Sequence, residues 1–329
     1  MRSRGTSGKL RIVRVLLPIA LACSFLSLAV FATNAHPVLL VYGFQPIPGF
    51  RATQIWEVMA EYLSGGNVVD ALPMGVDAGH TMFFLPAVDE AHLDVYISDY
   101  ALALEPTARD IAFYASRLAR EISIVASRSA DGRLDLVAHS IGGLIARAYI
   151  ESDDIEPLVG SDEVPQFDAC YGGEIRTLIT LATPHHGIYF IGFGQWINTL
   201  GKQLTPGSRL LDALNEDHVD NGCLLSLQPD VRYVSLAGQT CFGCGLRRDQ
   251  DACIRDCVSA GLAWQGSDLV VLMASAFLPE ATNVACIGMD HVDMRTSPVV
   301  CSAVREILKG DEPPAAICED PQLLEPLDE

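Results

Sequence analysis

Basic residues are scarce in this sequence. Its 329 residues include 22 lysines and arginines against 41 aspartates and glutamates, which gives a net charge of −19 at pH 7. Five of the basic residues and none of the acidic ones lie within residues 1–35, so the chain beyond them has a net charge of −24. Nucleic acids bind to basic surfaces. The composition therefore predicts no nucleic-acid partner.

Other patterns are missing as well. The sequence contains no internal repeat and no glycine-rich loop of the kind that cradles a phosphate group. It also lacks a second block of strand and helix patterns that would form another large domain. Because 50% of the residues are hydrophobic, a single large core is feasible. We expect one domain over residues 36–310 and an acidic, proline-rich tail over residues 311–329, which is frayed unless Cys318 holds it in place.

The N-terminus has the layout of a secretory signal. Residues 1–14 carry basic but no acidic side chains, and residues 15–32 are predominantly apolar and uncharged. Small residues follow, so the pattern predicts a signal peptide cleaved after Ala35 and a secreted or periplasmic protein. An apolar run of this length also suffices to cross a bilayer, which makes an N-terminal membrane anchor the alternative. Cleavage is favoured because the first predicted strand follows almost at once.

Nine cysteines lie beyond the predicted signal. In an exported protein they are first predicted to form disulfides, and their odd number predicts at least one free thiol or an intermolecular bridge. Four of them belong to a cysteine-rich insertion over residues 239–265, where three hypotheses stay open: two nested disulfides, a zinc site or a redox-active pair. The nested pairing would join Cys241 to Cys257 and Cys244 to Cys253.

Strand and helix patterns alternate along the rest of the chain. Short apolar runs typical of buried strands are followed by segments with apolar residues at helical spacing. This order predicts an α/β fold with a mostly parallel central sheet and helices on both faces. The expected strands are residues 37–41, 81–85, 94–97, 134–138, 175–181, 231–236 and 284–287, and the expected helices are residues 53–64, 106–126, 144–150, 188–200, the end of 204–215 and 299–308.

The most informative stretch is residues 134–144, Leu-Asp-Leu-Val-Ala-His-Ser-Ile-Gly-Gly-Leu. A buried-strand pattern passes through a pentapeptide of the Gly-x-Ser-x-Gly type into a helical pattern, which is typical of a nucleophile elbow. Ser140 would stand at the end of the sheet with its hydroxyl raised, and the helix start favours negative charge developing beside it. Ala138 replaces the usual first glycine. His139, the variable residue of the motif, is expected to point away.

A serine hydroxyl is a weak nucleophile and needs a histidine base that is held by an acid. His291 follows the last predicted strand, and Asp268 lies on a loop after an earlier one. The nucleophile, the acid and the histidine then follow one another along the chain in the order found in enzymes with such an elbow. Asp290 and Asp293 flank the histidine and are rivals for the role of the acid.

The tetrahedral intermediate of acyl transfer needs hydrogen-bond donors for its oxyanion. We expect the backbone N–H groups of Phe44, in the loop after the first strand, and of Ile141, directly after the serine. Apolar side chains at helical spacing within residues 188–200 form either a lid over an acyl pocket or a core helix. The side chains expected to contact substrate are Tyr42, Tyr189, Phe193 and Trp196.

Two adjacent histidines, His185 and His186, lie in a Thr-Pro-His-His-Gly segment after the strand at residues 175–181. Neighbouring side chains diverge, and no carboxylate lies close in sequence, so we do not expect them to bind a metal ion together.

These motifs resemble those of the α/β-hydrolase lipases, in particular the bacterial secreted triacylglycerol lipases with an Ala-His-Ser-x-Gly-Gly elbow. The resemblance extends over residues 37–308 and is most specific at the elbow and at the Thr-Pro-His-His-Gly loop. It implies the α/β-hydrolase fold and catalysis without a cofactor. By position, the family's triad and oxyanion donors fall on Ser140, Asp268, His291, Phe44 and Ile141.

The chain departs from that family at two places. Its first loop begins Tyr42-Gly43 where the family usually has His-Gly, which implies an altered pocket rim but an intact backbone donor. The cysteine-rich insertion is not a shared feature.

Some relatives hold a structural calcium ion through an aspartate two residues after the histidine, a position occupied here by Asp293. No second acidic ligand is identifiable.

The leading hypothesis is thus a secreted serine carboxylic-ester hydrolase, a lipase, that acts on acyl esters of lipids through an acyl-enzyme on Ser140. It would contact a lipid interface transiently. Two alternatives stay open: a deacylase of lipid anchors or thioesters that uses the same triad, and a hydrolase-fold binding protein without catalytic activity. The sequence makes no prediction of oligomeric state.

Overall fold

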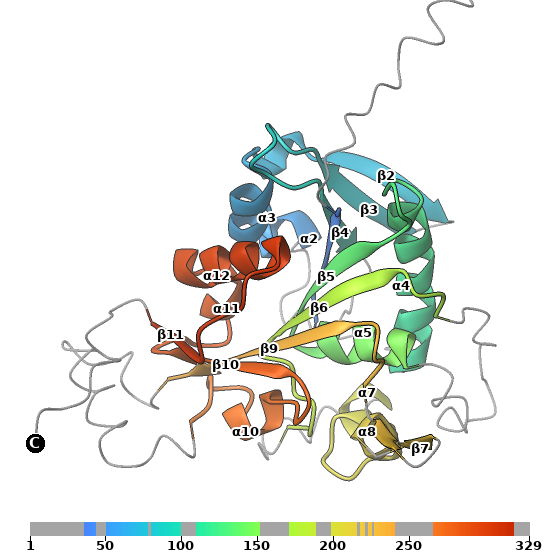
Figure 1. The fold of residues 1–329 in the computed structure, drawn as a ribbon, viewed down its shortest axis with the longest axis vertical. Coiled ribbons are helices and arrows are strands. Elements are labelled where there is room, and N and C mark those ends of the chain that lie inside the picture. Colours follow the sequence, from blue (N-terminus) through green and yellow to red (C-terminus); the bar gives the residue numbers. More distant parts are fainter. Residues whose placement is uncertain are drawn as a thin grey trace, which may run out of the picture. The chain divides into compact units, whose positions relative to one another are not determined.

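A mixed sheet of nine strands forms the centre of the computed structural model, in the order β11-β10-β9-β6-β5-β1-β4-β3-β2 (Figure 1). All neighbouring pairs are parallel except β4–β3 and β3–β2. The strands are Val38–Val41 (β1), Leu72–Asp77 (β2), His80–Leu85 (β3), Val95–Asp99 (β4), Leu134–His139 (β5), Ile175–Leu181 (β6), Arg232–Gln239 (β9), Thr282–Ile287 (β10) and Ala316–Cys318 (β11). A separate antiparallel pair joins His218–Asp220 (β7) and Cys223–Leu225 (β8).

The structure describes residues 36–43, 51–77, 80–99, 110–151, 171–188, 199–215, 218–220, 223–225, 227–240 and 266–318. The predicted signal peptide and nearly all of the cysteine-rich insertion lie outside these ranges. Within them, no helix is long and apolar enough to cross a membrane.

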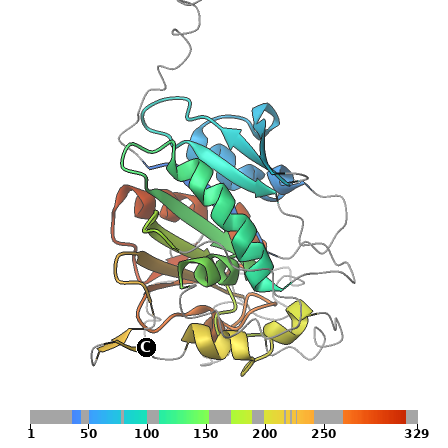
Figure 2. The same ribbon diagram turned by 90° about the vertical axis from the view of Figure 1, so that its right-hand side faces the viewer.

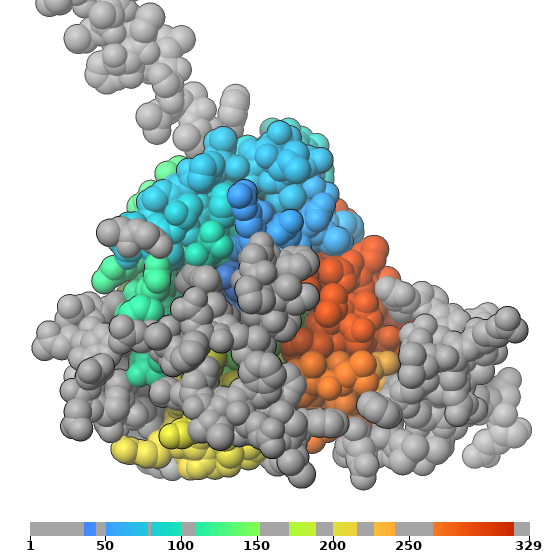
Figure 3. Space-filling view, turned by 180° about the vertical axis from the view of Figure 1, so that it is seen from behind, coloured from blue at the N-terminus to red at the C-terminus, as the bar shows by residue number. Residues whose placement is uncertain are grey.

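Helices cover both faces of the sheet, which confirms the predicted fold class. One face carries α4 (Ile111–Ala126) and α5 (Ile141–Ile150), and α4 crosses the sheet diagonally in Figure 2. The other face carries α2 (Ala52–Ile55), α3 (Glu57–Ser64), α11 (Asp293–Thr296) and α12 (Pro298–Lys309). Figure 3 shows that the N-terminal segment in blue adjoins the C-terminal segment in red and orange, where α3 contacts α12. The shorter helices are Val68–Asp70 (η1), Thr199–Gln203 (α7), Arg209–Asn215 (α8) and Met273–Ala276 (α10).

The central strands form where apolar residues predominate in the sequence. All residues of β1 and β5 are buried, as expected for parallel strands that are covered by helices on both faces. Val41 pairs with Ala138, and His139 pairs with Leu181, so the carboxyl ends of β1, β5 and β6 meet at the same edge. In open α/β sheets this edge is where ligands bind.

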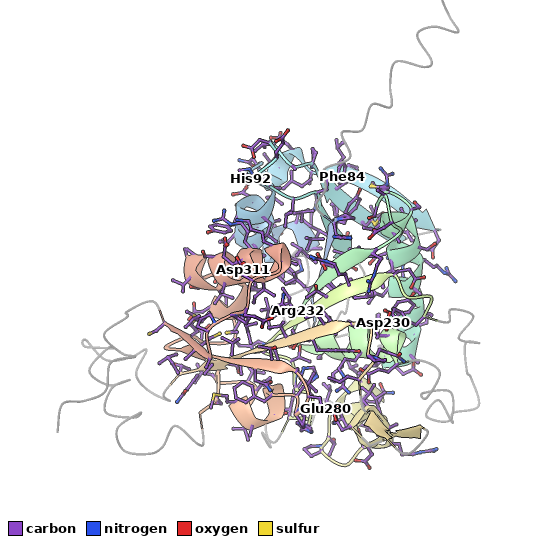
Figure 4. All side chains as sticks on the ribbon, viewed as in Figure 1. Phe84, His92, Asp230, Arg232, Glu280 and Asp311 are labelled. Carbon is purple, nitrogen blue, oxygen red and sulfur yellow. The ribbon has the colours of Figure 1, made fainter. Side chains whose placement is uncertain are left out.

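The structure corrects two local predictions. The helix expected at residues 53–64 is divided into α2 and α3 at Trp56, whose indole is fully buried. The tail is not frayed at its start, because β11 pairs in parallel with β10. Arg232 of β9 anchors the connecting segment by donating a hydrogen bond of 2.7 Å to the carbonyl oxygen of Asp311, and both residues are marked in Figure 4.

The cysteine predictions are tested only in part. Cys170, Cys241, Cys244, Cys253 and Cys257 lie outside the described residues. Cys286 of β10 and Cys301 of α12 are free thiols, so the expectation of disulfides is wrong for these two. Both are fully buried in the same apolar cluster, where burial raises the pKa of Cys301 to about 12 and that of Cys286 further. They serve as small apolar core residues.

A buried ion pair at the end of α5 also binds helix α8. Arg147 and Glu151 lie one helical turn apart, and two hydrogen bonds of 3.0 Å join the guanidinium to the carboxylate. The remaining guanidinium N–H groups donate to Asn215, at 3.0 Å, and to the carbonyl oxygen of Leu214. Because Ser140 directly precedes α5, this cluster fixes the helix next to the predicted nucleophile.

Replacing Arg147 by methionine is expected to lower the free energy of unfolding by about 3–5 kcal/mol, because it leaves the Glu151 carboxylate buried without its partner. Chemical denaturation monitored by circular dichroism measures this. The matched control is Arg120→Met, which breaks the pair with Asp77 at a site where the arginine side chain is 63% exposed. That variant is expected to lose less than about 1 kcal/mol. Equal losses in the two variants would contradict the structural role of the buried pair.

Candidate active site

Ser140 occupies a sharp turn between β5 and α5. Its φ of 57° and ψ of −132° lie outside the regions that non-glycine residues usually adopt. The Ser140 N–H group donates to the Leu181 carbonyl oxygen at 2.9 Å, and the Ser140 carbonyl oxygen accepts from the Gly143 N–H group at 3.1 Å. Neighbouring backbone thus holds the strained conformation, as in the nucleophile elbow that the sequence predicts.

The first loop packs directly against this elbow. A Cβ atom on Gly43 would lie 2.6 Å from the Ile141 nitrogen and 2.8 Å from Ser140 Cβ. Glycine is therefore required at position 43 for the two segments to approach. Ile141 is the first residue of α5, where backbone N–H groups have no acceptor within the helix. This amide has the placement expected of an oxyanion donor, whereas the predicted second donor, Phe44, lies outside the described residues.

Asp268 and His291 are joined by a short hydrogen bond. His291 Nδ1 donates to Asp268 Oδ2 at 2.6 Å, which leaves Nε2 of the ring as the basic nitrogen. Asp268 is almost fully buried, and its other oxygen accepts the N–H groups of Val270, at 2.9 Å, and Val271, at 2.6 Å. The carboxylate is therefore held in one orientation. The structure brings together the acid and the histidine that the sequence predicts.

The rival acids have other roles. Asp290 Oδ1 accepts the N–H groups of Val292, at 2.8 Å, and Asp293, at 2.9 Å. Asp293 Oδ2 in turn accepts the Asp290 N–H group at 2.9 Å. Both carboxylates therefore accept backbone N–H groups of the turn that contains His291. Among the described residues no group of three histidine, cysteine or acidic side chains could hold a metal ion, so calcium binding by Asp293 stays an untested prediction.

His139 does not point away from the site, contrary to the sequence-based expectation. Its Nε2 donates to the main-chain carbonyl oxygen of His291 at 2.8 Å, and the two imidazole rings lie 4.6 Å apart between centroids. The residue before Ser140 thereby contacts the predicted base. No hydrogen bond between Ser140 Oγ and His291 is present among the described residues. Such contacts are often long without substrate and shorten in the reacting complex.

Gly238 is a functional position that the sequence analysis missed. A Cβ atom there would lie 2.8 Å from Asp268 Cβ and 2.9 Å from the Met289 carbonyl oxygen. Because Gly238 has no side chain, the loop that carries Asp268 (the acid loop) and the loop that carries His291 (the histidine loop) can meet at this point of β9. The available signal was a glycine near the end of a predicted strand, which often marks a close backbone approach.

The Gly238→Ala variant is expected to lower kcat for ester hydrolysis at least about 10-fold, because the new methyl group displaces Asp268 relative to His291. Steady-state kinetics on a chromogenic ester measures the effect. Gly75→Ala is the control, since a Cβ atom at this exposed position of β2 meets nothing within 4 Å. Wild-type kcat in Gly238→Ala would show that the two loops tolerate displacement.

The remaining predicted site residues divide into two groups. The ring of Tyr42 is buried in the core, and burial raises its pKa beyond the usual range of tyrosine. Its contact with substrate stays a prediction. Phe193, Tyr189 and Trp196 lie outside the described residues.

His185 and His186 diverge as predicted. The first contacts Arg147 and Thr180 inside the core, and the second lies 3.2 Å from the Phe277 carbonyl oxygen.

Comparison with known proteins agrees with this geometry. Residues 88–221, less than half of the chain, match the family described as "Putative serine esterase (DUF676)", and the match includes Ser140. No curated protein sequence matches the chain. The fold is similar to that of the lipase BlEst2 from Bacillus licheniformis in its mature form, with a TM-score of 0.50 and 18% identity over 83% of this chain and 92% of that one. The propeptide form of the same lipase has a TM-score of 0.51 and 18% identity over 85% of this chain and 51% of that one.

These findings define the fold of the protein. The sheet order and the helices on both faces are those of an α/β-hydrolase, and the structural similarity to BlEst2 shows the same fold. The family match supports a serine esterase. The chain has the α/β-hydrolase fold, and its residues 88–221 match a family of putative serine esterases.

Proposed function

We propose that this protein hydrolyses acyl esters of lipids through an acyl-enzyme on Ser140, with His291 as the base and Asp268 as the acid that orients it. The observation that carries the proposal is the Asp268–His291 hydrogen bond of 2.6 Å beside a serine held in a strained turn. General-base catalysis by a serine hydrolase requires a carboxylate that is aimed at the imidazole of the base.

In the proposed mechanism Ser140 Oγ attacks the ester carbonyl carbon while His291 Nε2 takes the hydroxyl proton. The N–H group of Ile141, with that of Phe44 as the predicted second donor, stabilises the oxyanion. Collapse of the tetrahedral intermediate breaks the bond to the alcohol, which receives the proton from His291. Water then attacks the acyl-enzyme with His291 again as base, which releases the fatty acid and restores Ser140.

Two exposed apolar side chains support a lipid substrate. Leu269 directly follows the acid and is 45% exposed, and Val292 directly follows the histidine and is 50% exposed. Leu269 also has a φ of 76°, a conformation that is unfavourable for leucine. An exposed and strained apolar residue beside a catalytic acid is consistent with contact to an acyl chain or a lipid surface.

The proposal includes export of the protein. It is supported by the basic segment, the apolar run and the small residues that precede the first strand. Cleavage after Ala35 would leave the whole described domain intact. N-terminal sequencing of protein recovered from the periplasm or the medium tests this part of the proposal.

The function is tested by hydrolysis of p-nitrophenyl esters with acyl chains from two to sixteen carbons (about the range that separates esterases from lipases), in parallel with matching thioesters. We expect activity that rises with chain length on oxygen esters. A preference for short chains would overturn the lipid assignment, and a preference for thioesters would favour the deacylase alternative. Folded protein without activity on any of them would contradict the proposed function.

A further inference from the structure

His291 is held at its backbone as well as at its ring. Its N–H group donates to the Asp268 carbonyl oxygen at 2.9 Å, and its ring donates to the Asp268 carboxylate. The third polar group of the residue, the carbonyl oxygen, accepts the hydrogen bond of 2.8 Å from His139 Nε2. Two of these three hydrogen bonds join His291 to Asp268. The third joins His291 to His139, the residue before the nucleophile.

His139 is itself fixed by its surroundings. Only 7% of the residue is exposed, and the indole of Trp56 meets its ring edge-on, with ring centroids 6.4 Å apart and an interplanar angle of 84°. Arg295, in the helix that follows the histidine loop, donates to the carbonyl oxygen of Ile55, next to Trp56. The junction of α2 and α3, the end of β5 and the histidine loop therefore form one connected unit.

The charge state of His139 suits a permanent donor. Burial, then the proximity of His291 and Arg295, lower the pKa of His139 well below its ordinary value. The imidazole is consequently neutral, and the hydrogen bond to the His291 carbonyl places its proton on Nε2. A neutral ring also adds no charge that would oppose the imidazolium formed on His291 during acylation.

We propose that His139 is a positioning residue for catalysis: its Nε2–H group fixes the carbonyl side of His291, so that the imidazole keeps its bond to Asp268 and its free nitrogen faces Ser140. The inference rests on the proposed function. A histidine before the nucleophilic serine would then act as a link between the elbow and the base. The side chain takes no part in bond making or breaking.

Two substitutions at His139 distinguish the effect of its N–H donor from the effect of its aromatic ring. His139→Phe keeps an aromatic ring against Trp56 and His291 but has no N–H group. His139→Gln removes the ring and keeps an N–H group at a similar distance from the backbone. We expect His139→Phe to lower kcat about 10- to 100-fold with little change in KM, because misorientation of the base affects the chemical step and not substrate binding. We expect His139→Gln to retain kcat within about threefold of the wild type, by the same reasoning.

Proton NMR supplies a readout that a purely structural role would not change. The short Asp268–His291 hydrogen bond should give a strongly downfield imidazole proton in the wild type and in His139→Gln. The same signal should be broadened or lost in His139→Phe, while thermal unfolding shows that the variant is folded. If His139→Phe does not fold, His139→Asn replaces it, because the shorter amide cannot contact the carbonyl oxygen and should show the same loss.

The outcomes distinguish this inference from the proposed function. Wild-type protein without Ser140-dependent esterase activity would remove the function on which the inference rests. Active wild-type protein with normal kcat and a normal downfield signal in folded His139→Phe would overturn the inference alone. A loss of kcat in His139→Gln as large as in His139→Phe would also overturn it, since the ring and not the donor would then matter.

Discussion

Replacing Ser140 by alanine is expected to lower kcat for ester hydrolysis at least about 10⁴-fold. The hydroxyl is the only atom group removed, and without it no acyl-enzyme forms. Residual hydrolysis would come from the oxyanion donors and from substrate binding alone. Initial rates on a p-nitrophenyl ester at saturating substrate measure the effect. A pre-steady-state burst of p-nitrophenol, measured with substrate in excess over enzyme and expected in the wild type, should be absent from the variant.

The control for this variant is Ser98→Ala, which removes the hydroxyl of a fully buried serine on β4. We expect it to keep kcat close to that of the wild type. Thermal unfolding should show that both variants are folded, and Ser140→Ala is expected to be at least as stable as the wild type, because catalytic residues are seldom optimal for stability. A Ser140→Ala protein with substantial esterase activity would assign the nucleophile to another residue.

The second large effect is expected for Asp268→Asn, which should lower kcat about 10⁴-fold. The asparagine amide keeps the size of the side chain but can place an N–H group toward His291 Nδ1. The imidazole then turns to the tautomer with the proton on Nε2, and this nitrogen can no longer accept the proton of Ser140. Kinetics on the same ester measures kcat, and a crystal structure of the variant would show whether the loop geometry is preserved.

Asp290→Asn distinguishes the proposed acid from its neighbour. The amide oxygen of asparagine can still accept the two backbone N–H groups that Asp290 Oδ1 accepts now. We therefore expect kcat within about 10-fold of the wild type, a change that corresponds to roughly 1.4 kcal/mol of transition-state energy. If Asp290→Asn lost as much activity as Asp268→Asn, the assignment of the acid would be wrong.

Patterns within short segments predicted most of the central fold. The sequences of β1, β5 and β6 are predominantly apolar because helices bury both faces of these strands, so their composition indicates them. The helix α12 was predictable for local reasons as well: Ser297 caps its start, Pro298 is its first residue, and Gly310 ends it with a φ of 103°.

The missed elements are stabilised by contacts that sequence patterns do not encode. Strand β2 contains Pro73 and Gly75, both disfavoured in strands, and forms only because it is an edge strand paired with β3. Strand β11 is three residues long and depends on pairing with β10. The division of the predicted helix at Trp56 follows from burial of the indole, which no local signal marks.

The site shows the same division. Ser140, Asp268 and His291 could be predicted because each stands in a recognisable place within a strand–loop pattern. His139 was misjudged because its partner, the carbonyl oxygen of His291, lies 152 positions away in the sequence. Gly238 was missed for a similar reason, since it matters only because two distant loops meet above it. Residues that position other residues are identified from contacts in the structure, which the sequence does not show.

The most direct test of the account is covalent labelling of the wild-type protein with a p-nitrophenyl alkylphosphonate. The proposed site predicts release of one equivalent of p-nitrophenol and a phosphonate adduct on the peptide that contains Ser140, located by mass spectrometry. His291→Ala, which lacks the base, should react at least about 100-fold more slowly, consistent with the usual contribution of general-base catalysis. Folded wild-type protein without an adduct, or with an adduct on another residue, would contradict the assignment of Ser140 as the nucleophile.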